Sequence, residues 1–74
     1  MPDMTYDPEA DAAYLYLGDG PIIESEEVAP GIVLDHDAEG RVVGIEVLGA
    51  SKVLAPGDWS SARLPGPRVV EAAE

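Results

Sequence analysis

The sequence contains no cysteine and no phenylalanine, and only one histidine and one tryptophan among its 74 residues. Without cysteine the chain forms no disulfide, thiolate nucleophile or cysteine-ligated zinc site. It has no apolar run near the roughly 18 residues of a membrane span, and no basic segment leading into an apolar block, as in a secretory signal. We therefore expect a cytoplasmic protein with no membrane partner.

Basic residues are scarce as well. Four Lys and Arg stand against 15 Asp and Glu, which gives a formal net charge of -11 at pH 7. Binding to nucleic acid requires clustered basic side chains that neutralise phosphates, so we predict no nucleic-acid partner. An anionic protein is instead steered toward basic partners.

The chain is also short. A domain near this length buries only about 60% of the surface that its unfolded chain exposes, so its stability is marginal. Disulfides, metals or partners usually support such domains, and disulfides are excluded here. Hydrophobic residues make up 46% of the sequence, unlike a disordered acidic tail. This combination predicts a homo-oligomer, most simply a homodimer, or a complex with another protein.

The composition changes at Pro56. Residues 1–55 hold twelve of the acids and two of the bases, whereas residues 56–74 are richer in proline and nearly balanced in charge. Proline and glycine interrupt regular structure. We predict one small β-rich domain over 1–55, followed by a Pro/Gly-rich arm or disordered tail over 56–74.

Within 1–55 the apolar residues alternate with a period of two, which indicates strands. The expected strands cover residues 4–6, 12–17, 22–29, 32–36 and 41–48, with a short helix inside 49–55. The acids of segment 22–29 suit an exposed edge, because charge there discourages pairing between sheets. The predicted fold is mainly β (α+β), an antiparallel β-meander of four to five strands with one short C-terminal helix.

Two registers are open for the hairpin over residues 32–48. A four-residue loop pairs Leu34 with Val43 and Ile32 with Ile45, whereas a three-residue loop with a glycine bulge pairs Val33 with Ile45. We favour the first, because it gathers the apolar side chains on one face.

An acidic segment in this hairpin has the spacing of a calcium loop. Asp35, Asp37 and Glu39 occupy positions one, three and five, Gly40 position six and Glu46 position twelve. An EF-hand loop lies between helices, however, and both flanks here predict strands. We interpret the segment as an acidic hairpin loop and predict no cofactor; divalent-cation binding at these four carboxylates is an alternative.

His36 lies between two aspartates, and a neighbouring carboxylate can orient a histidine as a general base. The serines, however, lie in no Gly-x-Ser-x-Gly elbow, and a chain this small has little room for a deep pocket. We predict no catalytic residue and no enzymatic activity. The alternative is an enzyme with a site between subunits that uses His36 with Asp35 or Asp37.

Three aromatic residues are candidates for an interface. Tyr14 and Tyr16 lie on the strand face opposite Leu15, and Trp59 lies in the C-terminal segment. Aromatic side chains with a polar tip are enriched in protein interfaces. The alternative is that the helix or tail of the same chain covers them.

Three blocks together resemble a small bacterial family, domain of unknown function 2283. They are residues 6–15 (YDPEADAAYL), residues 27–35 (EVAPGIVLD) and residues 37–48 (DAEGRVVGIEVL), the last followed by Ala50-Ser51. Ala13 departs from the pattern, since a larger apolar residue is expected there. The resemblance covers about residues 4–54 and implies a compact β-rich protein with no established activity. It also implies an antitoxin-like role, because some members resemble components encoded beside small basic toxin-like proteins.

The sequence thus predicts a small acidic, non-enzymatic protein-interaction module. Its expected partner, besides a second copy, is a small basic protein such as a ribonuclease-type toxin, whose nucleic acid the acidic surface would mimic.

Overall fold

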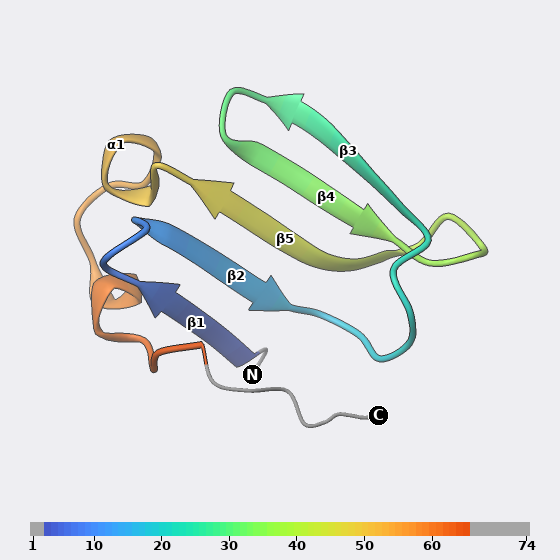
Figure 1. Cartoon of the computed structure of the whole chain (residues 1–74), viewed down its shortest axis with the longest axis horizontal. Coiled ribbons are helices and arrows are strands. Elements are labelled where there is room, and N and C mark those ends of the chain that lie inside the picture. Colours follow the sequence, from blue (N-terminus) through green and yellow to red (C-terminus); the bar gives the residue numbers. More distant parts are fainter. Residues whose placement is uncertain (1–2, 66–74) are drawn as a thin grey trace.

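A computed structural model describes residues 3–65, which form a five-stranded antiparallel sheet with the strand order β1-β2-β5-β4-β3 (Figure 1). The predicted fold class is confirmed. The elements are β1 (Asp3–Asp7), β2 (Ala12–Tyr16), β3 (Glu24–Ala29), β4 (Ile32–His36), β5 (Val42–Leu48), the short helix α1 (Ala50–Val53) and the 3-10 helix η1 (Asp58–Ser61).

The strand order departs from that of a simple meander. Strands β3, β4 and β5 follow one another as hairpins, and the β1–β2 hairpin adds to the free side of β5. Strand β3 therefore lies at the far edge of the sheet although it follows β2 in the chain. All six of its residues are exposed, which confirms the prediction that this acidic segment is an edge strand.

The favoured register of the β4–β5 hairpin is wrong by two residues, and the alternative register is wrong by one. Leu34 pairs with Ile45, and Ile32 pairs with Val47. The difference has two local causes, a β-bulge beside Asp35 and a longer loop over residues 37–41. The Asp37 carboxylate organises that loop by accepting the backbone N–H groups of Glu39 and Arg41, each at 2.9 Å. A two-residue shift preserves the side-chain faces. Of the five residues that the favoured register placed on one face, Ile32 is paired with Val47 and Leu34 with Ile45, and Val43 has no partner in this ladder.

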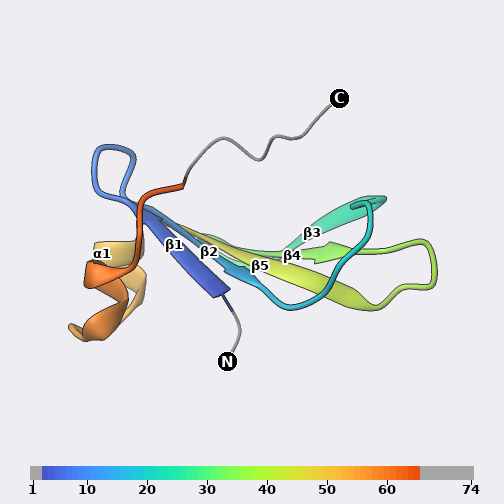
Figure 2. The ribbon, with the colours of Figure 1, turned by 90° about the horizontal axis from the view of Figure 1, so that it is seen from below.

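The apolar face of the sheet is covered at one end only. Both short helices lie over this face near the end of β5, and the rest of the sheet extends beyond them (Figure 2). Beneath the helices Ala13, Val47 and Ala50 form a small buried cluster. Leu54 and Trp59 pack against it from the helical side. The small side chain of Ala13 is thus part of the core and is 1% exposed.

A second set of apolar side chains lies across the sheet beside this cluster. The pairings place one residue from each of four neighbouring strands in line, and we call this set the apolar row: Met4, Leu15, Ile45 and Leu34. Each of the four is only partly buried. Among the described residues no large side chain is fully buried. The helices are too short to enclose the whole face.

The segment after α1 returns to the sheet along β1. The Trp59 ring packs edge-on against Tyr6 with centroids 5.0 Å apart, and the Trp59 indole N–H donates to the Ala55 carbonyl at 2.6 Å. Farther on, the Arg63 carbonyl accepts the Tyr6 N–H at 2.9 Å. Residues 58–63 of the predicted arm therefore pack on the domain, and residues 66–74 of it lie outside the described residues.

One carboxylate joins the β1–β2 turn to the start of α1. The Ser51 hydroxyl donates to Asp11 at 2.6 Å and the Ser51 N–H at 3.0 Å, while the Tyr6 hydroxyl donates to Asp11 at 2.7 Å. The Asp11 carbonyl also accepts the Ala50 N–H at 2.8 Å. Because the residue before the helix is Gly49, with no side chain, Asp11 supplies the N-terminal cap from a distant part of the chain.

We expect replacement of Asp11 by Asn to lower the thermal midpoint at pH 7 by several degrees. Hydrogen bonds from Ser51 and then from Tyr6 lower the pKa of the Asp11 carboxyl. A lowered pKa in the folded state stabilises the protein above the unfolded pKa of about 4, and this stabilisation is lost as the pH falls through the folded value. The deficit of Asp11→Asn should therefore shrink below about pH 4. Thermal unfolding followed by circular dichroism at pH 7 and pH 3 measures the difference in midpoint between Asp11→Asn and the original sequence. The same change at the exposed Asp19, Asp19→Asn, is the control. A deficit equal at both pH values contradicts this account.

Candidate functional site

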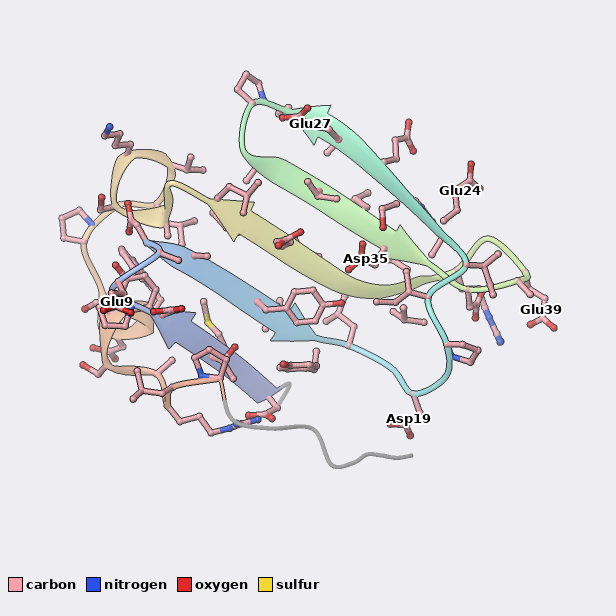
Figure 3. All side chains as sticks on the ribbon, in the orientation of Figure 1. Glu9, Asp19, Glu24, Glu27, Asp35 and Glu39 are labelled. Atoms are coloured by element: carbon pink, nitrogen blue, oxygen red, sulfur yellow. The ribbon has the colours of Figure 1, made fainter. Side chains whose placement is uncertain are left out.

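The sheet face opposite α1 carries a polar cluster built by three strands. Asp35 from β4 is 5% exposed and accepts two hydroxyl groups. The Tyr14 hydroxyl donates to Oδ2 at 2.7 Å, and the Ser25 hydroxyl donates to Oδ1 at 2.6 Å. Figure 3 shows Asp35 on the sheet surface well inside the outline of the sheet. A buried carboxylate requires such partners, because burial without them is costly.

Gly44 makes this cluster possible. Tyr14 lies directly opposite Glu46 on β5, and Asp35 lies opposite Gly44 on the same strand. The Tyr14 side chain therefore reaches diagonally over Gly44 to meet Asp35. A Cβ atom on Gly44 would overlap the end of the Tyr14 ring. The glycine is needed for the space that it leaves, and its φ is not in the left-handed region.

The cluster is suited to a structural role. Burial, and then the hydrogen bond to Asp35, raise the pKa of the Tyr14 hydroxyl well above its ordinary value. Tyr14 therefore remains a neutral donor throughout the physiological range, and Asp35 has one hydroxyl on each oxygen. Neither group is set up as a base or a nucleophile, because each is committed to the other.

A shallow hollow borders the cluster. Its volume is about 220 Å³, and its lining residues are Tyr14, Tyr16, Gly18, Gly20, Ile22 and Val43. The two tyrosine rings meet edge to face with centroids 4.6 Å apart. Small-molecule sites usually enclose about 300–1,000 Å³ and converge several polar groups. This hollow is smaller than that range and open to solvent.

The structure does not bring the calcium-like carboxylates together. Asp35 is engaged by Tyr14 and Ser25, while Asp37 accepts backbone N–H groups of its own loop and the Arg41 guanidinium at 3.0 Å. Glu39 pairs with the same Arg41. Within residues 3–65 no group of three or more His, Cys, Asp or Glu side chains is placed to hold a metal ion. Glu46 lies apart on β5, opposite Tyr14.

His36 is not joined to its neighbouring aspartates either. It follows Asp35 in β4, and consecutive strand residues point to opposite faces. The Asp37 carboxylate is occupied by the loop. In the part of the chain that the structure describes, no hydrogen bond links His36 to either carboxylate, so the sequence neighbours do not form an acid–base pair.

The three aromatic interface candidates do not form one surface. Tyr14 and Tyr16 lie on the sheet face that carries Asp35, opposite the buried cluster, and both are partly buried. Trp59 packs on the opposite face against the core of its own chain. The partial exposure of the apolar row was not anticipated from the sequence, although the alternation of the expected strands 32–36 and 41–48 had placed Leu34 and Ile45 on one face.

The comparisons with known proteins identify a family and no individual relative. Residues 3–51 match the model of a family described as protein of unknown function (DUF2283). No curated protein and no solved structure matches the chain. Over residues 3–65, no helix has the length and apolar character required to cross a membrane.

We expect Gly44→Ala to destabilise the fold by about 1–3 kcal/mol, the usual cost of overpacking. The new methyl group would displace Tyr14 and leave Asp35 with one hydroxyl. Urea unfolding followed by tryptophan fluorescence measures the loss.

Gly57→Ala is the matched control, because a methyl group there meets ordinary contacts of 3.6 Å or more. Tyr14→Phe provides a second check: its cost should be smaller in the Gly44→Ala background than in the original sequence, because the hydrogen bond is already lost. Equal stability of the two alanine variants would refute the role given to Gly44.

Proposed function

Because the chain belongs to DUF2283, a family of proteins of unknown function, we propose its function from its own structure: it is a non-enzymatic protein-interaction module. The observation that carries this proposal is the apolar row of Met4, Leu15, Ile45 and Leu34, each of which is only partly buried.

The apolar row supports a protein partner because its exposure is unfavourable in the isolated chain. Leu15 and Leu34 are partly exposed and lie outside the buried cluster under the helices. Fully burying a leucine side chain is worth about 1.5–3 kcal/mol. A contiguous apolar surface on a small protein typically marks a contact with another macromolecule. A partner that covers the row gains this energy.

The charge distribution supports a basic partner. Arg41 is already paired with Asp37 and Glu39, and Arg63 is paired with Asp3, so two of the four bases are neutralised within the chain. Glu26 lies opposite Leu34 and continues the apolar row to the edge of the sheet. A complementary surface has an apolar centre and basic side chains toward that edge. Small proteins that bind nucleic acid carry clustered basic side chains, which agrees with an antitoxin-like role.

The polar face supports a non-enzymatic role. The buried carboxylate there accepts one hydroxyl group on each oxygen, and the neighbouring hollow is shallow. This face stabilises the sheet and leaves the opposite face for contacts.

A second copy of the chain is the other candidate for the apolar row. The small core favours it, since self-association is a common support for domains of this size. The net charge of -11 on each copy opposes it. A homodimer is therefore the second proposal for the same surface.

We expect the double variant Leu15→Gln/Leu34→Gln to weaken partner binding at least about tenfold, because two central apolar contacts are lost. The protein is purified from its host at low salt, the bound protein is identified and purified, and the affinity is measured by calorimetry. Leu64→Gln, at an exposed leucine outside the row, is the control.

The proposal is supported by a basic companion protein that binds more weakly as the salt concentration rises. Its binding should also weaken in Leu15→Gln/Leu34→Gln (the row variant) and should not weaken in Leu64→Gln. Light scattering of the protein alone tests the second copy: a mass of two chains that returns to one chain in the row variant supports the homodimer. A monomer recovered without any companion, or a companion that binds the row variant normally, overturns the proposal for this surface.

A further inference from the structure

The two edges of the sheet are treated differently by the fold. At the β1 edge the Arg63 carbonyl accepts the Tyr6 N–H, and residue 63 forms a parallel bridge with Thr5. At the other edge β3 pairs with β4 on its inner side, and no described strand lies on its outer side. The backbone of β3 is therefore the accessible template for an additional strand.

We infer that β3 binds an extended, basic segment of the partner by strand addition. This inference rests on the proposed function and specifies how the basic partner is held. In strand addition the backbone supplies hydrogen bonds, and alternate side chains supply specificity. Here specificity comes from the side chains that β3 presents beside the incoming strand.

Two glutamates of β3 are free to pair with such a strand. Glu24 and Glu26 are exposed, and within residues 3–65 neither carboxylate takes part in a side-chain hydrogen bond or an ion pair. Both lie on the face of the apolar row, because they pair with His36 and Leu34. Glu27 points to the other face and accepts the Gly31 N–H at 3.3 Å. Figure 3 shows Glu24 projecting outward from the sheet at this edge.

The same charges exclude a second copy from this edge. Two β3 strands side by side would bring glutamates against glutamates, and like charges directly opposite one another destabilise a sheet. An incoming strand with basic residues at alternate positions would instead place opposite charges beside each other, which stabilises a sheet. Its basic side chains lie beside Glu24 and Glu26, and its other side chains lie beside Ser25 on the polar face.

The length of the site is limited by the backbone of β3. Regular pairing with β4 runs from Glu24 to Glu27 and is interrupted by a bulge before Ala29. The turn at Pro30 follows. The edge therefore fits a segment of about four residues, whose basic residue beside Glu26 extends the apolar row outward.

The test uses the full chain and a short synthetic peptide of alternating arginine and threonine, followed by NMR. We expect the amide signals of residues 24–27 to shift and their hydrogen exchange to slow, while those of β1 change little. Two control peptides separate strand addition from charge attraction: the same peptide with every second backbone nitrogen methylated, and one of equal composition with the arginines in a block. Both should bind several times more weakly.

Variants of the protein test the two glutamates. We expect Glu24→Gln/Glu26→Gln to weaken peptide binding about fivefold, from the usual strength of opposite-charge pairs across strands. Glu9→Gln/Asp19→Asn removes the same charge from exposed positions away from β3 (Figure 3) and should change binding little.

Shifts spread over the whole acidic surface, equal binding of the methylated peptide, or equal effects of the two double variants overturn strand addition at β3. If the natural partner then still depends on Leu15 and Leu34, the proposed function stands and only this mode of binding fails. If the peptide behaves as expected while no basic partner exists, the proposed function fails and the edge remains a strand-binding site.

Discussion

The main constraint on the structure is a shortage of covering elements: the five-stranded sheet has one apolar face, and within residues 3–65 two short helices lie over it. Helix α1 spans four residues and η1 another four, and both lie at one end of one face. Burial of apolar surface is the main stabilising contribution in a small domain. The consequence is a core of small residues such as Ala13 and Ala50, with larger side chains only partly enclosed.

The fold offsets this shortage with hydrogen bonds that join distant segments. Asp11 links the first turn to the start of α1 and so keeps the helix over the sheet. On the polar face Asp35 of β4 accepts hydrogen bonds from Tyr14 of β2 and Ser25 of β3, and so joins three strands. Charged or buried hydrogen bonds of this kind are worth more than exposed ones. Asp11 and Asp35 therefore each act as a structural clamp between segments that are distant in the sequence.

Much of the fold could be predicted from the sequence, because period-two alternation is a local signal. The strands, the exposed edge of β3 and the common face of Leu34 and Ile45 all follow from it. The register of the β4–β5 hairpin could not be predicted in this way, because a bulge and the Asp37 loop shift the pairing without changing the alternation of apolar residues. The polar cluster was also missed, because Tyr14 meets Asp35 only through the strand order. Its one signal in the sequence was Gly44, a glycine inside an otherwise apolar strand.

The helices leave two surfaces uncovered, the apolar row and the edge strand β3, and each would contribute differently to the binding of a partner. The apolar row gives energy to any protein that covers it but distinguishes poorly between partners. In the proposed mode of binding, the edge strand β3 supplies selectivity between partners, because Glu24 and Glu26 repel an identical acidic edge and attract a basic strand. In this mode of binding, the acids on this edge have two effects: they disfavour self-pairing of the sheet, and they favour a strand of opposite charge. A domain with so little interior gains most from a partner that satisfies both surfaces at once.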